Sequence, residues 1–244
     1  MILRYKKSIE IKQLNLYNKN NENNCRGRRQ MEILVVKADP EADFDSYCGR
    51  FVKYISPERR ERVERMRSER DRITSVLAEL TVRIQIILHT GMKNEDIRFD
   101  YGEHGKPFLY GRDDFQFSFS HAGGYVAFVC GCRSVGVDIE RTDREKENIA
   151  RKHFTENEYE AIYTRKEKTF AEIWTAKEAY VKYLGTGLSK GLNTFDVLDG
   201  STGCRFVSFD IPGGYNATVC LDTDDEVTCR VITADEVFEY YDSF

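Results

Sequence analysis

Apolar residues that alternate with polar ones predict β-strands in several parts of the chain. Phe115, Phe117 and Phe119 alternate with polar residues, the pattern of a strand with one buried face. Other short apolar or alternating runs have the length of strands. They lie at 33–36, 97–99, 125–132, 135–140, 203–210, 215–221 and 227–233.

Apolar residues at helical spacing predict the helices. Within 71–88 they form a stripe along one side of an amphipathic helix, and we assign that stripe to the core. Ser56, Pro57 and Glu58 form a helix start, and that helix runs to about Met66. Further helices are predicted at 143–153, 155–164 and 168–184, with a helix or turn plus helix at 40–54 and a short helix near Asp235.

The order of these elements, helices and then strands twice over, predicts an α+β fold with two sub-domains. A faint internal repeat supports this prediction. In the first half, Ser56-Pro57-Glu58 opens a helix and is followed by Ala78-Glu79. In the second half, Thr155-Glu156-Asn157 opens a helix and is followed by Ala176-Lys177-Glu178. We expect an N-terminal half at 31–134 and a C-terminal half at 135–244. About the last 20 residues are expected to pack back on the N-terminal half.

The first 30 residues differ from the rest in composition. They are rich in Asn and carry a net charge of +6, which leaves −10 on the remainder of the chain. Two interpretations fit: a disordered basic tail, or translation from an upstream start with Met31 as the natural first residue. The acidic body argues against general nucleic-acid binding, although an RNA-binding module that uses the basic tail is an alternative.

Overall composition is that of a folded protein without a membrane segment. The 244 residues are 41% hydrophobic and 12% aromatic, which excludes wholesale disorder. The longest apolar runs have the length of strands and fall short of the roughly 18 residues that a membrane helix needs. The seven cysteines are odd in number and lack C-x-x-C spacing. We therefore expect free thiols in a reducing, cytoplasmic compartment.

Two acidic residues on one predicted strand are the first candidate for chemistry. Asp138 and Glu140 are two positions apart in Gly-Val-Asp-Ile-Glu, so their side chains point to the same face. Adjacent carboxylates repel each other unless a positive charge lies between them. One interpretation is a solvated edge strand, and the other is a site of hard oxygen ligands for Mg²⁺ or Mn²⁺.

A predicted helix supplies the second candidate. Trp174, Glu178 and Lys182 are four residues apart and lie along one side, with Lys177 projecting beside them. A surface Glu–Lys pair is the plain interpretation. The alternative is a Glu for a metal and a Lys for a phosphate on one rigid helix.

Basic residues and one histidine form the third candidate. Ser120 and His121 precede a Gly-Gly turn, but neighbours on a strand face opposite ways, which disfavours a nucleophile–base pair. A His that contacts phosphate beside the turn fits better, with a simple capped turn as the alternative. Arg59 and Arg62 either belong to a solvated helix face or hold a phosphate together, and Lys106 is a lone cation at a turn.

Together these segments resemble the 4′-phosphopantetheinyl transferases of the two-half, surfactin-synthetase-activating type. The resemblance rests on the motifs at 136–140 and 174–182, and on Phe-Ser-Phe-Ser-His at 117–121 and Gly-Lys-Pro at 105–107. Further support comes from Ile-Ser-Pro-Glu-Arg-Arg at 55–60 and Gly-Thr-Gly-Leu-Ser at 185–189. The order fits from about Met31 onward. The resemblance implies two pseudo-symmetric α+β halves with the active site in the cleft between them.

The resemblance also implies a reaction and a set of site residues. A serine of an apo acyl or peptidyl carrier protein attacks the β-phosphate of coenzyme A, and adenosine 3′,5′-bisphosphate leaves. The implied metal ligands for Mg²⁺, or Mn²⁺ in its place, are Asp138, Glu140 and Glu178. Either Glu178 or a metal-bound water that it orients takes the serine proton. Lys182, with Lys177, is implied to act in catalysis by stabilising the leaving α-phosphate, and His121, Arg59 and Arg62 are implied to hold the 3′-phosphate. The full set of implied coenzyme A contacts is Arg59, Arg62, Lys106, Ser120, His121, Lys177 and Lys182.

One position departs from the family. Thr74 stands where family members often have a basic residue, and Arg70 or Arg72 is the candidate substitute. Because two halves in one chain already complete the cleft, we expect a monomer, and the acidic body and short apolar runs predict no nucleic-acid or membrane partner. By resemblance we expect a role in secondary-metabolite biosynthesis. A non-catalytic relative that binds coenzyme A or carrier proteins is the alternative.

Overall fold

The computed structural model describes residues 30–143, 146–187 and 191–243. The strands are β1 (Gln30–Lys37), β2 (Phe99–Tyr101), β3 (Pro107–Leu109), β4 (Gln116–Ala122), β5 (Tyr125–Gly131), β6 (Gly136–Arg141), β7 (Arg205–Ile211), β8 (Tyr215–Leu221) and β9 (Glu226–Thr233). The α-helices are α2 (Phe44–Tyr47), α3 (Pro57–Arg65), α4 (Glu69–Thr90), α5 (Glu147–His153), α6 (Glu156–Tyr163), α7 (Phe170–Leu184) and α8 (Ala234–Asp242). Short 3₁₀ helices are η2 (Gly49–Tyr54), η3 (Asn94–Asp96) and η5 (Leu192–Thr194).

These elements confirm the strands and helices predicted from the sequence, with their ends shifted by a few residues. The predicted helix at 40–54 is divided into α2 and η2. Of the predicted tail at 1–30, all but Gln30 lies outside the described residues.

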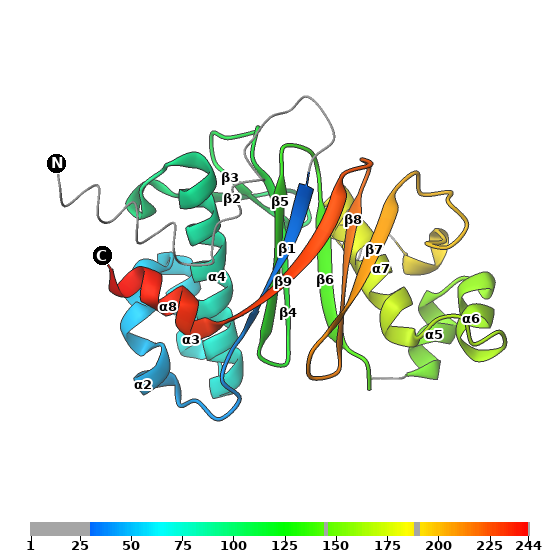
Figure 1. Cartoon of the computed structure of the whole chain (residues 1–244), viewed down its shortest axis with the longest axis horizontal. Helices are drawn as coiled ribbons and strands as arrows, with labels where there is room; N and C mark the ends of the chain where they lie inside the picture. Colours follow the sequence, from blue (N-terminus) through cyan, green and yellow to red (C-terminus); the bar gives the residue numbers. More distant parts are fainter. Residues whose placement is uncertain (1–29, 144–145, 188–190, 244) are drawn as a thin grey trace.

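Two β-sheets stack face to face at the centre of the molecule (Figure 1). One has the strand order β4-β5-β1-β9 and the other β6-β8-β7, and a small pair, β2-β3, lies apart. Alternate apolar residues, such as Ile33 and Val35 of β1 and Val137 and Ile139 of β6, form one buried cluster between the sheets. The other face of each sheet is covered by helices, α3, α4 and α8 on one side and α7 on the other (Figure 1).

The central helix of the N-terminal half is α4. By length and mean hydropathy, 1.2 over its apolar window, it is the one helix among the described residues that could cross a membrane. However, 78% of that window is buried inside the fold. Its apolar residues pack with β1, β5, α2, α3 and α8 in one cluster, so α4 is a core helix.

The end of the chain packs against the N-terminal half. Strand β9 lies parallel to β1 along its whole length, from Gln30 opposite Glu226 to Lys37 opposite Thr233. Helix α8 then covers α4 and η2, where the Phe238 ring stacks on Phe51 at 4.6 Å. The Tyr241 hydroxyl donates to the Leu80 carbonyl at 3.2 Å. The N-terminal core is therefore completed by residues that are last in the sequence.

The two halves repeat one pattern of helices. Ser56 caps α3, and Glu79 lies 23 residues further on, in α4. Thr155 caps α6, and Glu178 lies 23 residues further on, in α7. A basic residue follows each Glu by four positions, Arg83 in α4 and Lys182 in α7. This repeat, together with the two sheets, confirms the predicted α+β fold of two similar halves.

Phe238→Ala tests the contribution of α8. Removing this buried ring should lower the free energy of unfolding by about 3–5 kcal/mol, because it leaves a cavity against Phe51. The matched control is Glu239→Ala, an exposed position on the same helix that should change stability little. Chemical denaturation measures both, and equal stabilities would show that α8 is not part of the N-terminal core.

Candidate functional site

The two halves meet at the carboxylate of Asp138. Strand β4 lies along β6, where the Val137 amide donates to Ser118 Oγ at 3.1 Å. Ser120 Oγ donates to Asp138 Oδ1 at 2.6 Å, and Lys182 Nζ lies 2.7 Å from the same oxygen. Asp138 is only 6% exposed. One buried carboxylate therefore joins β4 of the first half to β6 and α7 of the second.

Gly136 lets α7 approach β6 closely enough for this contact. A Cβ atom at position 136 would lie 1.9 Å from the Ala179 carbonyl oxygen and 2.6 Å from the Tyr183 amide nitrogen. Both are backbone atoms, which cannot move aside without shifting the helix. The glycine that opens the Gly-Val-Asp-Ile-Glu motif therefore brings Glu178 and Lys182 beside Asp138.

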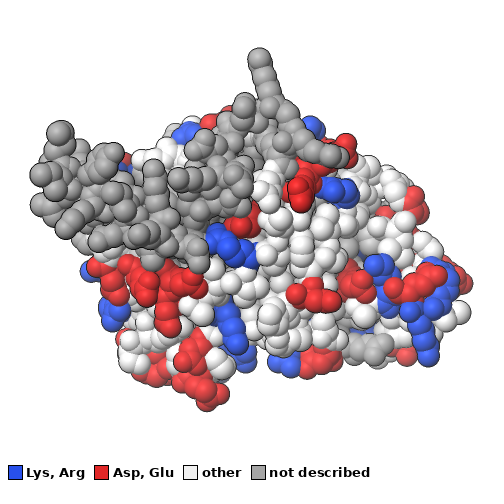
Figure 2. All heavy atoms as spheres, in the orientation of Figure 1, with Lys and Arg blue, Asp and Glu red and all other residues white. Residues whose placement is uncertain are grey.

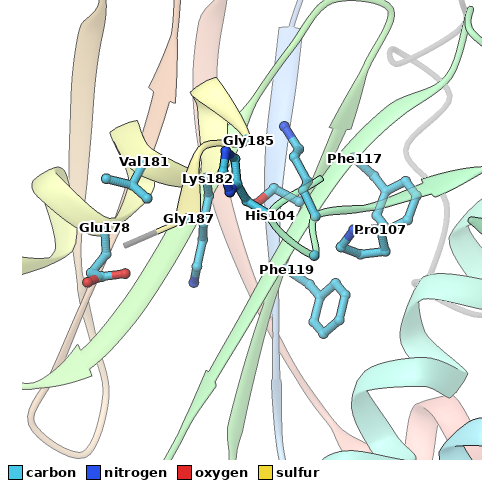
Figure 3. A pocket seen from close by; sticks show the side chains of 12 residues that line it. His104, Pro107, Phe117, Phe119, Glu178, Val181, Lys182, Gly185 and Gly187 are labelled. Atoms are coloured by element: carbon cyan, nitrogen blue, oxygen red, sulfur yellow. The ribbon is translucent and has the colours of Figure 1, made fainter. Parts of the chain in front are cut away.

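A pocket of about 230 Å³ lies beside this junction. Glu178 and Lys182 project from α7 on one side, and Phe119 and Pro107 lie on the other (Figure 3). The turn between β2 and β3 and the segment after α7 complete the wall. The remaining lining residues are His104, Gly105, Lys106, Phe117, Ser118, Val181, Gly185 and Gly187.

Glu178 is a half-buried acid that lies near a second carboxylate. Burial raises the pKa of the Glu178 carboxyl, the Asp138 carboxylate raises it further, and Lys182 opposes both effects. A carboxyl group with a raised pKa that lines a pocket is suited to accept a proton.

The predicted metal ligands do not converge on one point. Among the described residues, no three His, Cys, Asp or Glu side chains are grouped so that they could hold a metal ion. Asp138 is engaged by Lys182 and Ser120, and Glu140 Oε1 accepts a hydrogen bond from the Arg141 amide at 2.8 Å. The donors are nevertheless hard carboxylate oxygens on β6 and on the helix packed against it, which is the chemistry that Mg²⁺ prefers.

Basic side chains gather at the end of β4. The pKa of His121 is lowered by desolvation, although part of the residue stays exposed, and the positive charges of Lys182, Arg59 and Arg62 lower it further. Arg59 is held in place by Glu79, 3.2 Å from its Nε atom. Four of the predicted coenzyme A contacts, His121, Lys182, Arg59 and Arg62, therefore lie close enough to interact electrostatically. We call them the basic cluster, and their combined positive charge suits an anion.

Lys177 does not reach the pocket, and its predicted contact with coenzyme A is wrong. The residue is fully buried, and its Nζ atom lies 2.7 Å from Glu158 Oε2. It also donates to the carbonyls of Leu192 and Phe195, both at 2.7 Å. Burial lowers the pKa of Lys177 and raises that of Glu158, and their mutual attraction opposes both shifts. Lys177 anchors α7 to α6 and to the segment after η5.

Two other predicted contacts face the protein rather than open space. Lys106 Nζ lies within hydrogen-bond distance of Ser134 Oγ and of the Val135 and Tyr183 carbonyls, at 3.5, 3.2 and 3.3 Å. Burial lowers its pKa to about 8. The residue lines the pocket while its ammonium group ties the β2–β3 turn to α7. Ser120 is likewise committed to Asp138.

The position of Thr74 lies inside the fold. Its hydroxyl donates to the Arg70 carbonyl at 2.7 Å. Of the two candidate substitutes, Arg72 lies over the Phe44 ring at 3.7 Å and so faces α2. Arg70 donates to the Gly123 carbonyl, in the turn next to His121. Arg70 is therefore the substitute that the fold places near the basic cluster.

Sequence reasoning missed the role of Glu79. This buried carboxylate accepts hydrogen bonds from Ser56, Arg59 and Arg83, so it joins the start of α3 to α4 and orients Arg59. The sequence did carry a signal for this role, because Glu79 stands four residues before Arg83 in an otherwise apolar part of the predicted helix.

Comparisons with known proteins agree with this geometry. Residues 134–232 match the model of the 4′-phosphopantetheinyl transferase superfamily, and residues 44–133 match that of the 4′-phosphopantetheinyl transferase N-terminal domain. The chain is 31% identical over 187 residues to 4′-phosphopantetheinyl transferase Sfp of Bacillus subtilis, which covers 70% of this chain and 84% of the relative. It is 33% identical over 170 residues to 4′-phosphopantetheinyl transferase gsp of Aneurinibacillus migulanus, covering 68% and 70%.

A eukaryotic relative extends this similarity. The L-aminoadipate-semialdehyde dehydrogenase-phosphopantetheinyl transferase of Saccharomyces cerevisiae is 30% identical over 148 residues, covering 55% of this chain and 54% of the relative. The chain belongs to the 4′-phosphopantetheinyl transferase superfamily, and within it to the Sfp type.

Lys177→Met tests the structural role of Lys177. Removing the buried cation leaves the Glu158 charge unpaired, which should lower the free energy of unfolding by about 3–5 kcal/mol. The double variant Lys177→Met/Glu158→Leu, which removes both charges, should recover part of this loss. Chemical denaturation measures both. A single variant of normal stability that binds coenzyme A more weakly would restore the original prediction of a ligand contact.

Proposed function

We propose that the protein transfers the 4′-phosphopantetheine group of coenzyme A to a serine of an apo carrier protein and releases adenosine 3′,5′-bisphosphate. The observation that carries this proposal is the junction at Asp138, where Glu178 and Lys182 face a pocket between the two halves. The membership of the chain in the Sfp type supports the same reaction.

Glu178 is the proposed general base. Its carboxylate lines the pocket, and its raised pKa strengthens it as a proton acceptor. In the reaction it takes the proton from the carrier serine as the serine oxygen forms a bond to the β-phosphorus. The bond from that phosphorus to the bridging oxygen breaks, and the electron pair leaves with the α-phosphate.

Basic residues bind the phosphates. Lys182 lies four residues after Glu178 on α7 and lines the same pocket, and its proposed role is to balance charge that develops on the leaving α-phosphate. Within the basic cluster of His121, Lys182, Arg59 and Arg62, three residues, His121, Arg59 and Arg62, are proposed to hold the 3′-phosphate. Arg59 enters this cluster already oriented by Glu79, which reduces the entropy lost on binding.

Asp138, Glu140 and Glu178 are the residues that would hold Mg²⁺. Burial is the main cause of the raised pKa of Glu178, and the Asp138 carboxylate adds to it; a divalent cation held between these carboxylates would relieve their repulsion. When bound, the ion neutralises charge on the diphosphate oxygens. Ser120 keeps Asp138 oriented through its hydrogen bond from β4.

We propose a cytoplasmic monomer whose cleft is complete within one chain and which acts in secondary-metabolite biosynthesis. Among the described residues, Cys48, Cys130, Cys204, Cys220 and Cys229 are free thiols, as is usual in a reducing compartment. Over α5 and α6, acidic and basic side chains lie interspersed rather than forming a basic surface for nucleic acid (Figure 2).

Intact mass spectrometry tests the reaction. Purified apo acyl and peptidyl carrier proteins, incubated with the protein, coenzyme A and Mg²⁺, should gain the mass of one phosphopantetheine group, and EDTA should abolish the gain. Glu178→Gln should abolish transfer while the protein stays folded, and the control Glu160→Gln, an exposed acid on α6, should not. Binding of coenzyme A without transfer to any carrier would instead support a non-catalytic relative.

Arg62→Ala tests the phosphate contact. It should raise the KM for coenzyme A about tenfold, because an exposed charged contact to the 3′-phosphate is lost. The KM for dephospho-coenzyme A, which lacks that phosphate, should not change. Arg65→Ala is the matched control, since Arg65 is exposed on the same helix and pairs with Glu61 at 2.8 Å. Equal effects of the two variants would remove Arg62 from the site.

A further inference from the structure

Two hairpin turns, one in each half, hold each other through a reciprocal pair of tyrosines. Strands β4 and β5 are joined by Gly123-Gly124 and followed by Tyr125, and β7 and β8 are joined by Pro212-Gly213-Gly214 and followed by Tyr215. The same triplet, Gly-Gly-Tyr, therefore stands at the corresponding turn of each half. We call this pair of turns, with Tyr125 and Tyr215, the tyrosine clasp.

The contacts in the tyrosine clasp are reciprocal. The Tyr215 hydroxyl donates to the Gly123 carbonyl at 3.0 Å, and the Tyr125 hydroxyl donates to the Pro212 carbonyl at 2.8 Å. The two rings lie 4.4 Å apart, and each residue is only 4% exposed. Each half thus places one phenol against the backbone turn of the other half.

The fit leaves no room for a side chain in the first turn. Gly123 has a φ of +50°, and a Cβ atom there would lie 2.0 Å from the Tyr215 hydroxyl oxygen. The position of the Tyr215 hydroxyl therefore fixes the path of the turn. Arg70, from the first turn of α4, donates to the same carbonyl. Two donors, one from each half, converge on Gly123.

This turn carries His121 at its edge. His121 pairs with Val126 in the next-to-last pair of the β4–β5 ladder, two residues before Gly123. The remaining members of the basic cluster come from α3 and α7, so the position of His121 relative to them depends on how the hairpin is held. The second turn differs, because β7, which leads into Pro212, carries none of the proposed site residues.

We propose that Tyr215 is a positioning residue for coenzyme A binding: through Gly123 it fixes the hairpin that presents His121 to the 3′-phosphate. The proposal rests on the proposed function of the site. It assigns different roles to two tyrosines whose structural settings match. Tyr215 acts on the turn that carries a site residue, and Tyr125 acts on a turn that does not.

The paired variants Tyr215→Phe and Tyr125→Phe test this difference. Each removes one hydroxyl and one inter-half hydrogen bond of similar burial, so thermal denaturation should show a similar, modest loss of stability. Only Tyr215→Phe should raise the KM for coenzyme A, by roughly threefold to tenfold with kcat little changed. Neither variant should change the KM for dephospho-coenzyme A.

A double-mutant cycle tests the route of the effect. If Tyr215 acts through His121, then Tyr215→Phe should not change the KM further in a His121→Ala background. Additive effects, or equal effects of Tyr215→Phe and Tyr125→Phe in the wild-type background, would overturn the proposal and leave the clasp a purely structural contact. Absence of transfer by the wild-type protein would instead contradict the proposed function, so the two failures are distinguishable.

Discussion

The structure depends on one buried carboxylate that must find cationic and hydrogen-bonding partners from both halves of the chain. Burying Asp138 without partners would cost several kcal/mol, and Ser120 and Lys182 supply those partners from β4 and α7. The same contacts join the halves and bring together Asp138, Lys182 and Ser120, which are among the residues proposed to act in the reaction. Gly136 makes this possible, because only a residue without a side chain lets α7 lie so close to β6.

The two halves each contain a Glu followed four residues later by a basic residue, and the surroundings of this pair differ between the halves. In the N-terminal half, Glu79 and Arg83 form a buried pair at 2.7 Å, and Ser56 and Arg59 complete the contacts of the carboxylate. At the corresponding positions, Glu178 and Lys182 line a pocket, and Lys182 pairs with Asp138. A carboxylate whose contacts are satisfied stabilises the fold, whereas one that borders a pocket is available to substrate.

The sequence allowed prediction of the elements, the two-half fold and the strand and helix that carry Asp138, Glu178 and Lys182, because periodicity fixes which residues share a face. It could not show that Lys177 turns into the core, since neighbours on a helix diverge and tertiary packing decides which one meets the pocket. The hydrogen bonds of Lys106 and the central position of Glu79 depend on contacts distant in sequence. The last 20 or so residues were expected to pack on the N-terminal half, but the parallel pairing of β9 with β1 is a long-range contact that no local pattern encodes.

We propose that Asp138, Glu140 and Glu178 would come together around a divalent metal ion at the junction of the halves. A crystal structure with coenzyme A and Mn²⁺, with anomalous data collected at the manganese edge, tests it most directly. We expect one manganese peak in contact with these carboxylates and with the diphosphate of coenzyme A. The 3′-phosphate should lie beside His121 and Arg62. A peak elsewhere, or coenzyme A bound away from this junction, would contradict it.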